Sequence, residues 1–423
     1  VKTKGAEFKI KKVSALNSNE NLDAIFELKK CSNDKETEPS NCDGTAYTVI
    51  SNKEPTIIAE EGRYSIEETK VPDGYYKMPF QTIDINQSHT TFTNANEPIQ
   101  ITFYKKDDDT KKIITGNIGF TMYKCPNNNC SASNVKDAKN IVKVAYAKGQ
   151  GCYDVDNNST NHILYPNGSA KSEVKNGDGA VCVRKVLSGQ NYLIEESVIP
   201  EGYQKMQDQV IQAPKKEDEL IPVDPTYSGS ASEVSPDGTS SENETKYIYY
   251  NVPLKIKFYK EDSETKERIN KAGFKIYDGD TLVKFDARDS HGCYKVNSNG
   301  SVSEVFTDTS INNGKVCLSY VTSGKTYKVV ESTVPTGYTK MPDAQITATN
   351  KNNAATNISE KGLTDKPTIF RFIKTTNDTD NISKKYSSEI IKKIDSLTFN
   401  IHKVDSNQAL IFSNKGTTGL CSD

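Results

Sequence analysis

The residues best suited to chemistry are a glutamate and a lysine that recur along the chain inside alternating hydrophobic patterns. The glutamates are Glu68, Glu196 and Glu331. Each ends a Tyr-x-hydrophobic-x-Glu pattern such as YLIEE at 192–196, and the lysines end patterns such as ITFYK at 101–105. Because side chains alternate between the two faces of a strand, we expect these ionisable groups to face a core. Burial favours the neutral forms, which makes a lysine amine a nucleophile and a glutamate a proton donor.

The glutamates belong to a longer motif that repeats almost unchanged. It reads EETKVPDGYYKMP at 67–79, EESVIPEGYQKMQ at 195–207 and VESTVPTGYTKMP at 330–342. Three of the four methionines, Met78, Met206 and Met341, occupy the same place in it. The Pro-x-Gly step predicts a turn after each glutamate strand. Repetition at this level of detail is typical of tandem modules.

A second repeated block carries the lysines. It reads NEPIQITFYKKD at 96–107, NVPLKIKFYKED at 251–262 and DKPTIFRFIKTT at 365–376. Each block starts with Asn or Asp and reaches its Lys nine residues later. Near the start of the chain Phe8, Ile10 and Lys12 keep the alternation, although Lys11 is a rival for the lysine. Each block therefore ends one module and opens the next.

The blocks divide the chain into four predicted modules. They cover residues 1–98, 99–253, 254–367 and 368–423, and the last is an incomplete copy because it lacks the glutamate motif. Module two is enlarged by polar insertions, and we expect 207–246 to form a loop.

The pattern resembles Cna protein B-type domains, also called SpaA-like or prealbumin-like domains, of Gram-positive surface adhesins and pilins. The resemblance rests on the opening strand with its Lys, the Tyr-x-hydrophobic-x-Glu…Pro-x-Gly-Tyr motif and the terminal Asn or Asp. It implies an all-β chain of tandem Greek-key β-sandwich modules, Ig-like or prealbumin-like, arranged as an elongated stalk. It also implies a spontaneous isopeptide bond between Lys and Asn or Asp, promoted by a buried Glu.

Carried onto this sequence, the resemblance implies one cross-link in each complete module. The predicted sets are Lys12–Asn96 with Glu68, Lys105–Asn251 with Glu196, and Lys260–Asp365 with Glu331. Asn94 is a rival for Asn96, but only Asn96 keeps the spacing to the next Pro and Lys. Ammonia leaves from Asn and water from Asp, once per module, so the chain is predicted to process itself and not to be an enzyme.

The nine cysteines fall mainly into close pairs and show no metal-binding spacing. Such pairs persist as disulfides in an oxidising compartment, which predicts an exported protein. Cys152 and Cys293 lie in matching strands, as do Cys182 and Cys317, while Cys31 and Cys125 each follow a matching Phe by five residues. The predicted disulfides are Cys31–Cys42, Cys125–Cys130, Cys152–Cys182 and Cys293–Cys317. The partner of Cys421 would lie beyond the end of the chain.

Composition excludes several other classes. The formal net charge of -2 provides no basic excess for binding nucleic acid, and no apolar run is long enough to cross a bilayer. The four histidines are scattered, so we expect no metal ion and no cofactor. Because the chain begins at Val1 without a leader, we expect a mature or excised part of a longer precursor.

Three functional classes are considered. An enzyme would need a convergent polar site in one module, and none is visible. A structural stalk or pilin subunit on the bacterial cell surface, attached to the wall or part of a filament, fits modules that share no pocket. A ligand-binding adhesin would need one specialised module, and module two, with insertions at 126–180 and 207–246, is the candidate. The partners would be host extracellular matrix or neighbouring surface proteins. The sequence leaves open whether chains polymerise.

Overall fold

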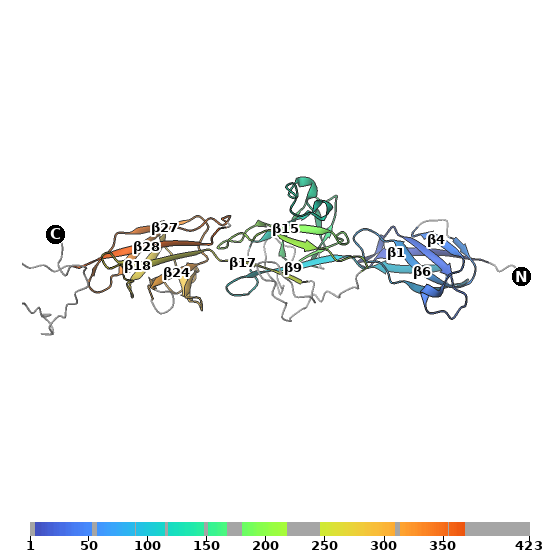
Figure 1. Ribbon diagram of the computed structural model, residues 1–423, viewed down its shortest axis with the longest axis horizontal. Helices are drawn as coiled ribbons and strands as arrows, with labels where there is room; N and C mark the ends of the chain where they lie inside the picture. The colour runs from blue at the N-terminus through green and yellow to red at the C-terminus, as the bar shows by residue number, and fades with distance from the viewer. Residues whose placement is uncertain are drawn as a thin grey trace, which may run out of the picture. The chain divides into compact units, whose positions relative to one another are not determined.

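A computed structural model describes nine segments of the chain. They are residues 5–52, 57–88, 90–114, 117–147, 151–166, 180–217, 246–308, 314–353 and 355–368. Nearly all regular structure in these segments is β-strand (Figure 1). The helical turns among them are the short 3-10 segments η1 (Pro39–Asn41), η2 (Pro126–Asn128) and η3 (Ala138–Asn140). The predicted all-β fold class is confirmed.

The first sandwich is formed by two four-stranded sheets. One has the order β4-β3-β6-β7, and the other joins β2, β5 and β8 to β1. The strands are β1 (Ala6–Ser14), β2 (Asn17–Asn21), β3 (Ile25–Lys30), β4 (Ala46–Ile50), β5 (Ile57–Ala59), β6 (Gly62–Lys70), β7 (Gln81–Ile85) and β8 (Thr91–Asn96). Phe8 on β1 and Phe26 on β3 share one core, so side chains of both sheets fill the space between them.

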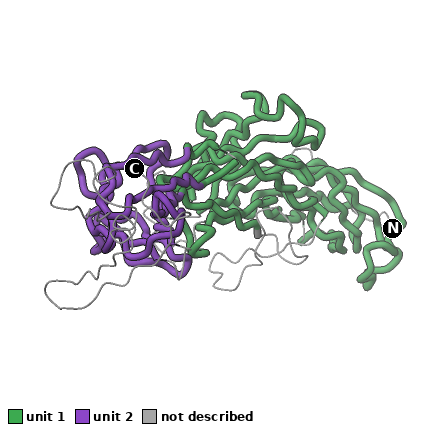
Figure 2. Tube along the Cα trace, turned by 60° about the vertical axis from the view of Figure 1, so that its left-hand side comes forward, with its two compact units in different colours: residues 1–254, 350–357 green, residues 255–349, 358–423 purple. Residues whose placement is uncertain are grey.

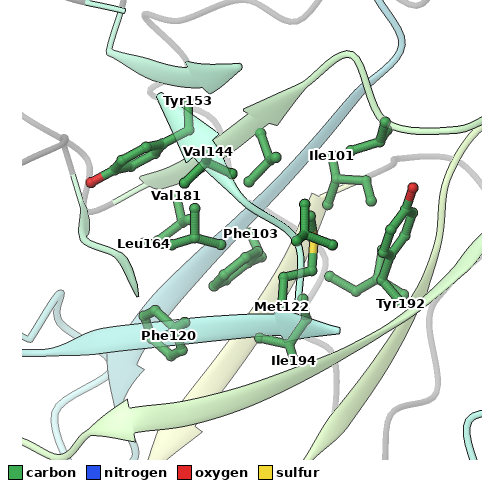
Figure 3. Packing of buried hydrophobic residues seen from close by; sticks show 14 of the residues in the cluster. Ile101, Phe103, Phe120, Met122, Val144, Tyr153, Leu164, Val181, Tyr192 and Ile194 are labelled. Carbon is green, nitrogen blue, oxygen red and sulfur yellow. The ribbon is translucent and has the colours of Figure 1, made fainter. Parts of the chain in front are cut away.

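The second sandwich repeats this plan with longer connections. Its sheets have the orders β13-β10-β15-β16 and β11-β12-β14-β9-β17. The strands are β9 (Gln100–Asp107), β10 (Gly119–Lys124), β11 (Val144–Ala147), β12 (Cys152–Val155), β13 (Ile163–Leu164), β14 (Ala180–Arg184), β15 (Asn191–Val198), β16 (Gln209–Gln212) and β17 (Lys246–Asn251). Figure 3 shows Phe103, Phe120 and Ile194 meeting between the sheets, with the two phenyl rings 5.1 Å apart and edge to face.

One strand corrects the sequence prediction for this sandwich. Residues 207–246 are predicted to form a loop, but β16 (Gln209–Gln212) pairs antiparallel with β15. Residues 218–245 of this predicted loop lie outside the described residues. Only Ile211 of this short strand is buried, so a polar strand with one core residue escapes a search for alternating hydrophobics.

The third sandwich also has two sheets. One has the strand order β20-β19-β25-β27, with β23 beside β19, and the other has the order β21-β22-β24-β18-β28-β26. The strands are β18 (Lys255–Asp262), β19 (Gly273–Asp278), β20 (Thr281–Leu282), β21 (Phe285–Arg288), β22 (Cys293–Val296), β23 (Val305–Phe306), β24 (Lys315–Ser319), β25 (Thr326–Thr333), β26 (Tyr338–Thr339), β27 (Ala344–Thr347) and β28 (Ile358–Pro367). Phe258 and Phe274 pack edge to face at 5.1 Å between its sheets.

The chain divides into two compact units (Figure 2). One holds residues 1–254 and 350–357, and the other holds the rest of the chain. The predicted fourth module, 368–423, lies outside the described residues apart from Thr368. Among the described residues, no helix has the length and apolar character needed to cross a membrane.

Candidate functional site

In each sandwich the strand that carries the lysine lies beside the strand that carries the Asn or Asp. These parallel pairs are β1 with β8, β9 with β17, and β18 with β28. The residue two positions after the lysine stands opposite Asn96, Asn251 or Asp365, which we call the acceptors. Lysine and acceptor are therefore diagonal neighbours on one face of the sheet, a spacing that long side chains can span.

The glutamates reach the same places from the opposite sheet. They lie on β6, β15 and β25, and the side chains of all three are buried. The three lysines and three acceptors are also buried, each at 2% exposure or less. Each sandwich thus gathers one amine, one carboxyl and one acceptor in a core where lone charges are costly.

In the first sandwich Lys12 contacts two amides. Its Nζ approaches Oδ1 of both Asn94 and Asn96 and lies 3.5 Å from Oε1 of Glu68. Nδ2 of Asn96 donates hydrogen bonds to Oε1 and Oε2 of Glu68, at 3.0 and 3.2 Å. Lys11, the rival lysine, is exposed.

The register of the strands separates the two amides. Asn94 stands opposite Lys12 itself, where the other sandwiches have Tyr249 and Leu363. Asn96 holds the position of the other two acceptors and is the amide that contacts the glutamate. Asn94 is only partly buried, whereas Asn96 is 2% exposed.

In the second sandwich the amide is held by the carboxyl, and the amine lies against a thioether. Nδ2 of Asn251 donates to Oε1 of Glu196 at 2.7 Å. Nζ of Lys105 lies 3.0 Å from Sδ of Met206, and a thioether sulfur accepts hydrogen bonds only weakly. Oδ1 of Asn251 is buried and has no hydrogen-bond partner among the described residues.

In the third sandwich two side chains of opposite formal charge meet in a fully buried place. Nζ of Lys260 lies 2.5 Å from Oδ1 of Asp365 and 3.4 Å from Oε1 of Glu331. The approach is close, yet its angles do not make a hydrogen bond: within the described structure Lys260 Nζ and both Asp365 oxygens have no hydrogen-bond partner. Buried polar atoms are rarely left in this state.

Burial shifts the pKa of two of the lysines and two of the glutamates toward their neutral forms. Desolvation lowers the pKa of Lys12 and of Lys105 to about 8, although Glu68 and Glu196 oppose the shift. Desolvation also raises the pKa of Glu196, against the charge of Lys105 and hydrogen bonds from Met206 and Asn251. Burial raises the pKa of Glu331 and the negative charge of Asp365 adds to the rise, against a hydrogen bond from Met341 and the charge of Lys260. These are the directions that favour a nucleophilic amine and a protonated carboxyl.

The repeated methionine has a role that sequence reasoning missed. Its backbone N–H donates to Oε2 of the glutamate ten residues earlier, at 2.9 Å from Met78, 2.8 Å from Met206 and 2.9 Å from Met341. While Oε2 accepts this bond, Oε1 faces the lysine in the first and third sandwiches and the amide of Asn251 in the second. The recurrence of Met was a visible signal, but the pattern could not show that a main-chain group makes the contact.

The structure joins eight cysteines in four disulfides. They are Cys31–Cys42, Cys125–Cys130, Cys152–Cys182 and Cys293–Cys317, the pairs expected from the sequence. Cys152 and Cys182 lie opposite each other on the parallel strands β12 and β14, and Cys293 and Cys317 do so on β22 and β24. Cys421 lies outside the described residues.

Comparison with known proteins identifies the fold at the level of a family. The family model described as the SpaA prealbumin-like fold domain matches residues 6–98 and 254–362. No curated protein matches the chain.

Several solved structures are similar at low sequence identity. The Bacillus anthracis TIE protein is 16% identical with a TM-score of 0.36, over 86% of this chain and 51% of that one. The chain thus spans about half the length of that structure. A streptococcal ancillary pilin is 14% identical with a TM-score of 0.34, over 86% and 99% of the two chains. The shaft pilin SpaA from Lactobacillus rhamnosus GG is 18% identical with a TM-score of 0.26, over 64% and 99%. It is the match to the family model that shows SpaA-type prealbumin-like fold domains in two segments of the chain, residues 6–98 and 254–362.

Proposed function

We propose that this chain is a load-bearing segment of a bacterial cell-surface protein, a stalk or pilin, whose sandwiches lock themselves with isopeptide bonds. The observation that carries the proposal is the contact between Lys260 and Asp365, 2.5 Å apart, fully buried and not hydrogen-bonded. A charged pair left in this state would lose its hydration without gaining good geometry. A covalent amide between the two side chains removes both charges.

The proposed reaction is a condensation. The neutral Nζ attacks Cγ of the acceptor, a C–N bond forms, and the C–N bond of Asn or the C–O bond of Asp breaks. In the unreacted first and second sandwiches the glutamate lies at the amide nitrogen of Asn96 and of Asn251, which is the group that leaves. The glutamate, once protonated, can therefore act as the general acid that relays the amine proton to the departing ammonia, or to the departing water at Asp365. The fold supplies the remaining rate enhancement by holding the groups in contact. Each site reacts once, so the chain is a self-processing structural protein and not an enzyme.

The bond would connect the first strand of a sandwich with the last. For Lys12 and Asn96, which are 84 residues apart, loop closure would stabilise the fold by roughly 4.5 kcal/mol. Force that enters at one end of a sandwich would cross directly from one strand to the other. The chain between the linked residues would then carry no load, which is the property that a surface stalk needs.

The disulfides support an extracellular location. Four disulfides in one chain indicate an oxidising compartment outside the cytoplasm. Together with the SpaA-type domains, they support the proposed position of the stalk at the cell surface.

The second sandwich offers a matched test, because Glu195 and Glu196 are adjacent on β15. Glu196 faces the cross-linking site, whereas Glu195 binds Lys136 and Lys205 at 2.9 and 2.8 Å on the other face. Glu196→Ala should leave Lys105 and Asn251 unlinked. The peptides that carry these two residues should then be separate, and together they should weigh one ammonia more than the linked pair. Glu195→Ala should keep the link. Equal linking in the two variants would contradict the assigned role of Glu196.

A second function is favoured by one feature of the second sandwich. Residues 125–143 form an addition with its own small core of Tyr123, Cys125, Val135 and Leu193, clasped by Cys125–Cys130. The corresponding connection is residues 31–45 in the first sandwich, also clasped by a disulfide, and residues 279–280 in the third. The connection is therefore longest in the second sandwich, and this is where an adhesin would carry a binding surface. Deleting 126–142, with Cys125→Ala because Cys130 is removed, should abolish binding to immobilised matrix proteins if this surface is used, and leave the three isopeptide bonds in place.

A further inference from the structure

The Pro-x-Gly-Tyr turn after each glutamate contacts both strands that the proposed bond would join. In the second sandwich the hydroxyl of Tyr203 donates a 2.7 Å hydrogen bond to Oδ2 of Asp107. In the third, Tyr338 donates to Oδ2 of Asp262 at 3.0 Å. Each aspartate lies two residues after the lysine and directly opposite the acceptor. The tyrosine therefore binds the strand of the nucleophile beside the reacting groups.

The same turns bind the acceptor strand through the main chain. Tyr203 forms a β-bridge with Pro253, and Tyr338 pairs with Pro367, in each case two residues beyond the acceptor. The carbonyl of the glycine before the tyrosine accepts a hydrogen bond from the residue three positions after the acceptor. The bond from Leu254 to Gly202 is 2.8 Å and that from Thr368 to Gly337 is 2.7 Å. These glycines have φ of +82° and +90°, a conformation that other residues rarely adopt.

The aspartates are built to hold the tyrosine hydroxyl. Oδ1 of Asp262 accepts hydrogen bonds from the N–H groups of Glu264 and Thr265, at 2.8 and 2.9 Å, which leaves Oδ2 for Tyr338. Both aspartates are buried, at 3% exposure for Asp107 and 6% for Asp262. A phenol bound to a fixed, buried carboxylate makes one of the stronger hydrogen bonds available in proteins.

Three residues after the tyrosine, the same segment returns to the catalytic carboxyl. The N–H of Met206 and of Met341 donates to Oε2 of Glu196 and Glu331. The turn thus connects the tyrosine contact to the orientation of the glutamate over a very short stretch of chain.

We propose that Tyr203 and Tyr338 are positioning residues for the cross-linking reaction, an inference that rests on the function proposed above. Each hydroxyl holds the turn closed over the end of the sandwich. The closed turn keeps the methionine N–H on Oε2, keeps Oε1 directed at the acceptor, and excludes water from the site.

The first sandwich provides a weaker version of the same contact. Tyr75 lies 3.3 Å from Oγ of Ser14 and 3.3 Å from Oε1 of Glu20, so no buried carboxylate holds it at short range. Removing this hydroxyl should therefore cost less than removing that of Tyr203 or Tyr338.

The test follows bond formation in the full chain after cell-free synthesis, with samples quenched in denaturant and linked peptides measured by mass spectrometry. Tyr338→Phe should slow the linking of Lys260 to Asp365 by about tenfold or more, the cost of losing a hydrogen bond to a charged group. Linking in the other two sandwiches should keep its wild-type rate. Tyr75→Phe, the matched comparison, should slow its own sandwich by roughly threefold or less.

The pH dependence of the linking rate distinguishes a positioning role from a purely structural one. It is measured where circular dichroism shows that wild type and variant are both fully folded. If Tyr338 keeps water from Glu331, the ratio of wild-type to variant rate should increase with pH, because a hydrated glutamate loses its proton more readily. A ratio of one at every pH would overturn the inference while leaving the proposed function intact. Absence of any link in the wild type would instead overturn both. Should Tyr338→Phe not fold, Tyr203→Phe provides the same comparison in the second sandwich.

Discussion

Lys11 and Lys12 are neighbours on β1, yet Lys12 is fully buried beside Glu68 and Lys11 is exposed. Strand alternation produces this difference, since successive side chains point to opposite faces. Only Lys12 can therefore reach an acceptor inside the sandwich.

A pair of lysine variants tests this assignment. Lys12→Arg should abolish the link to Asn96, because guanidinium stays protonated and is not a nucleophile at ordinary pH. Lys11→Arg, the control, should leave the link and the melting temperature unchanged. Peptide mapping after trypsin digestion distinguishes the two. A link mapped to Lys11 itself would show that Lys11, and not Lys12, faces the core.

The disulfides should make a separable contribution to stability. Replacing both Cys152 and Cys182 by Ala removes a cross-link over 30 residues, which should lower the free energy of unfolding by roughly 3–4 kcal/mol. Thermal unfolding of the variant and of the wild type, with and without reductant, measures this difference. Peptide mapping without reductant should find the four pairs of the structure, and a bond between Cys42 and Cys125 would be incompatible with it.

An unlinked Lys105 should make the stability of the fold depend on pH. In Asn251→Ala, Lys105 stays buried with a folded-state pKa of about 8, below the ordinary value of 10.5. Between these values the unfolded chain binds more protons than the folded chain, so stability rises as pH increases through this window and is lost as pH falls toward 8. The full shift corresponds to about 3 kcal/mol.

Urea unfolding of Asn251→Ala and of the wild type across this range checks the prediction. The wild type serves as the control, because its linked Lys105 would not titrate and the other groups cancel. Parallel stability curves for the two proteins would contradict a linked wild type.

Force spectroscopy tests the load-bearing role. Pulled by its ends under reducing conditions, the wild-type first sandwich should not extend, because load passes from Lys12 to Asn96. Glu68→Ala should unfold and release the 84-residue span between them, an extension of about 290 Å. Glu67→Ala, whose side chain pairs with Lys77 at 2.8 Å, should behave as the wild type. Full extension of the wild type would exclude a covalent path.

Much of this site could be predicted from sequence because repetition supplied what a single copy lacks. The alternating patterns placed Lys105 and Glu196 on buried faces, and the spacing of the repeated blocks selected Asn96 over Asn94. Matching strands likewise pointed to Cys152 and Cys182 as partners, which the parallel pairing of β12 and β14 explains.

Other features depend on contacts that no pattern encodes. The methionine N–H on the glutamate is a main-chain bond, so the side-chain type gave no indication of it. The contact between Tyr203 and Asp107 joins residues 96 positions apart and requires the fold to bring them together. Strand β16 was missed because it buries a single side chain.

The most direct test of the central claim is the intact mass of the fully reduced, denatured chain. Three cross-links predict a mass below that of the sequence by two ammonias and one water, with linked peptides joining Lys12 to Asn96, Lys105 to Asn251 and Lys260 to Asp365. Glu331→Ala should regain the one water, since the Lys260–Asp365 contact would remain non-covalent. A wild-type mass equal to that of the sequence, with the second and third sandwiches folded, would contradict the account.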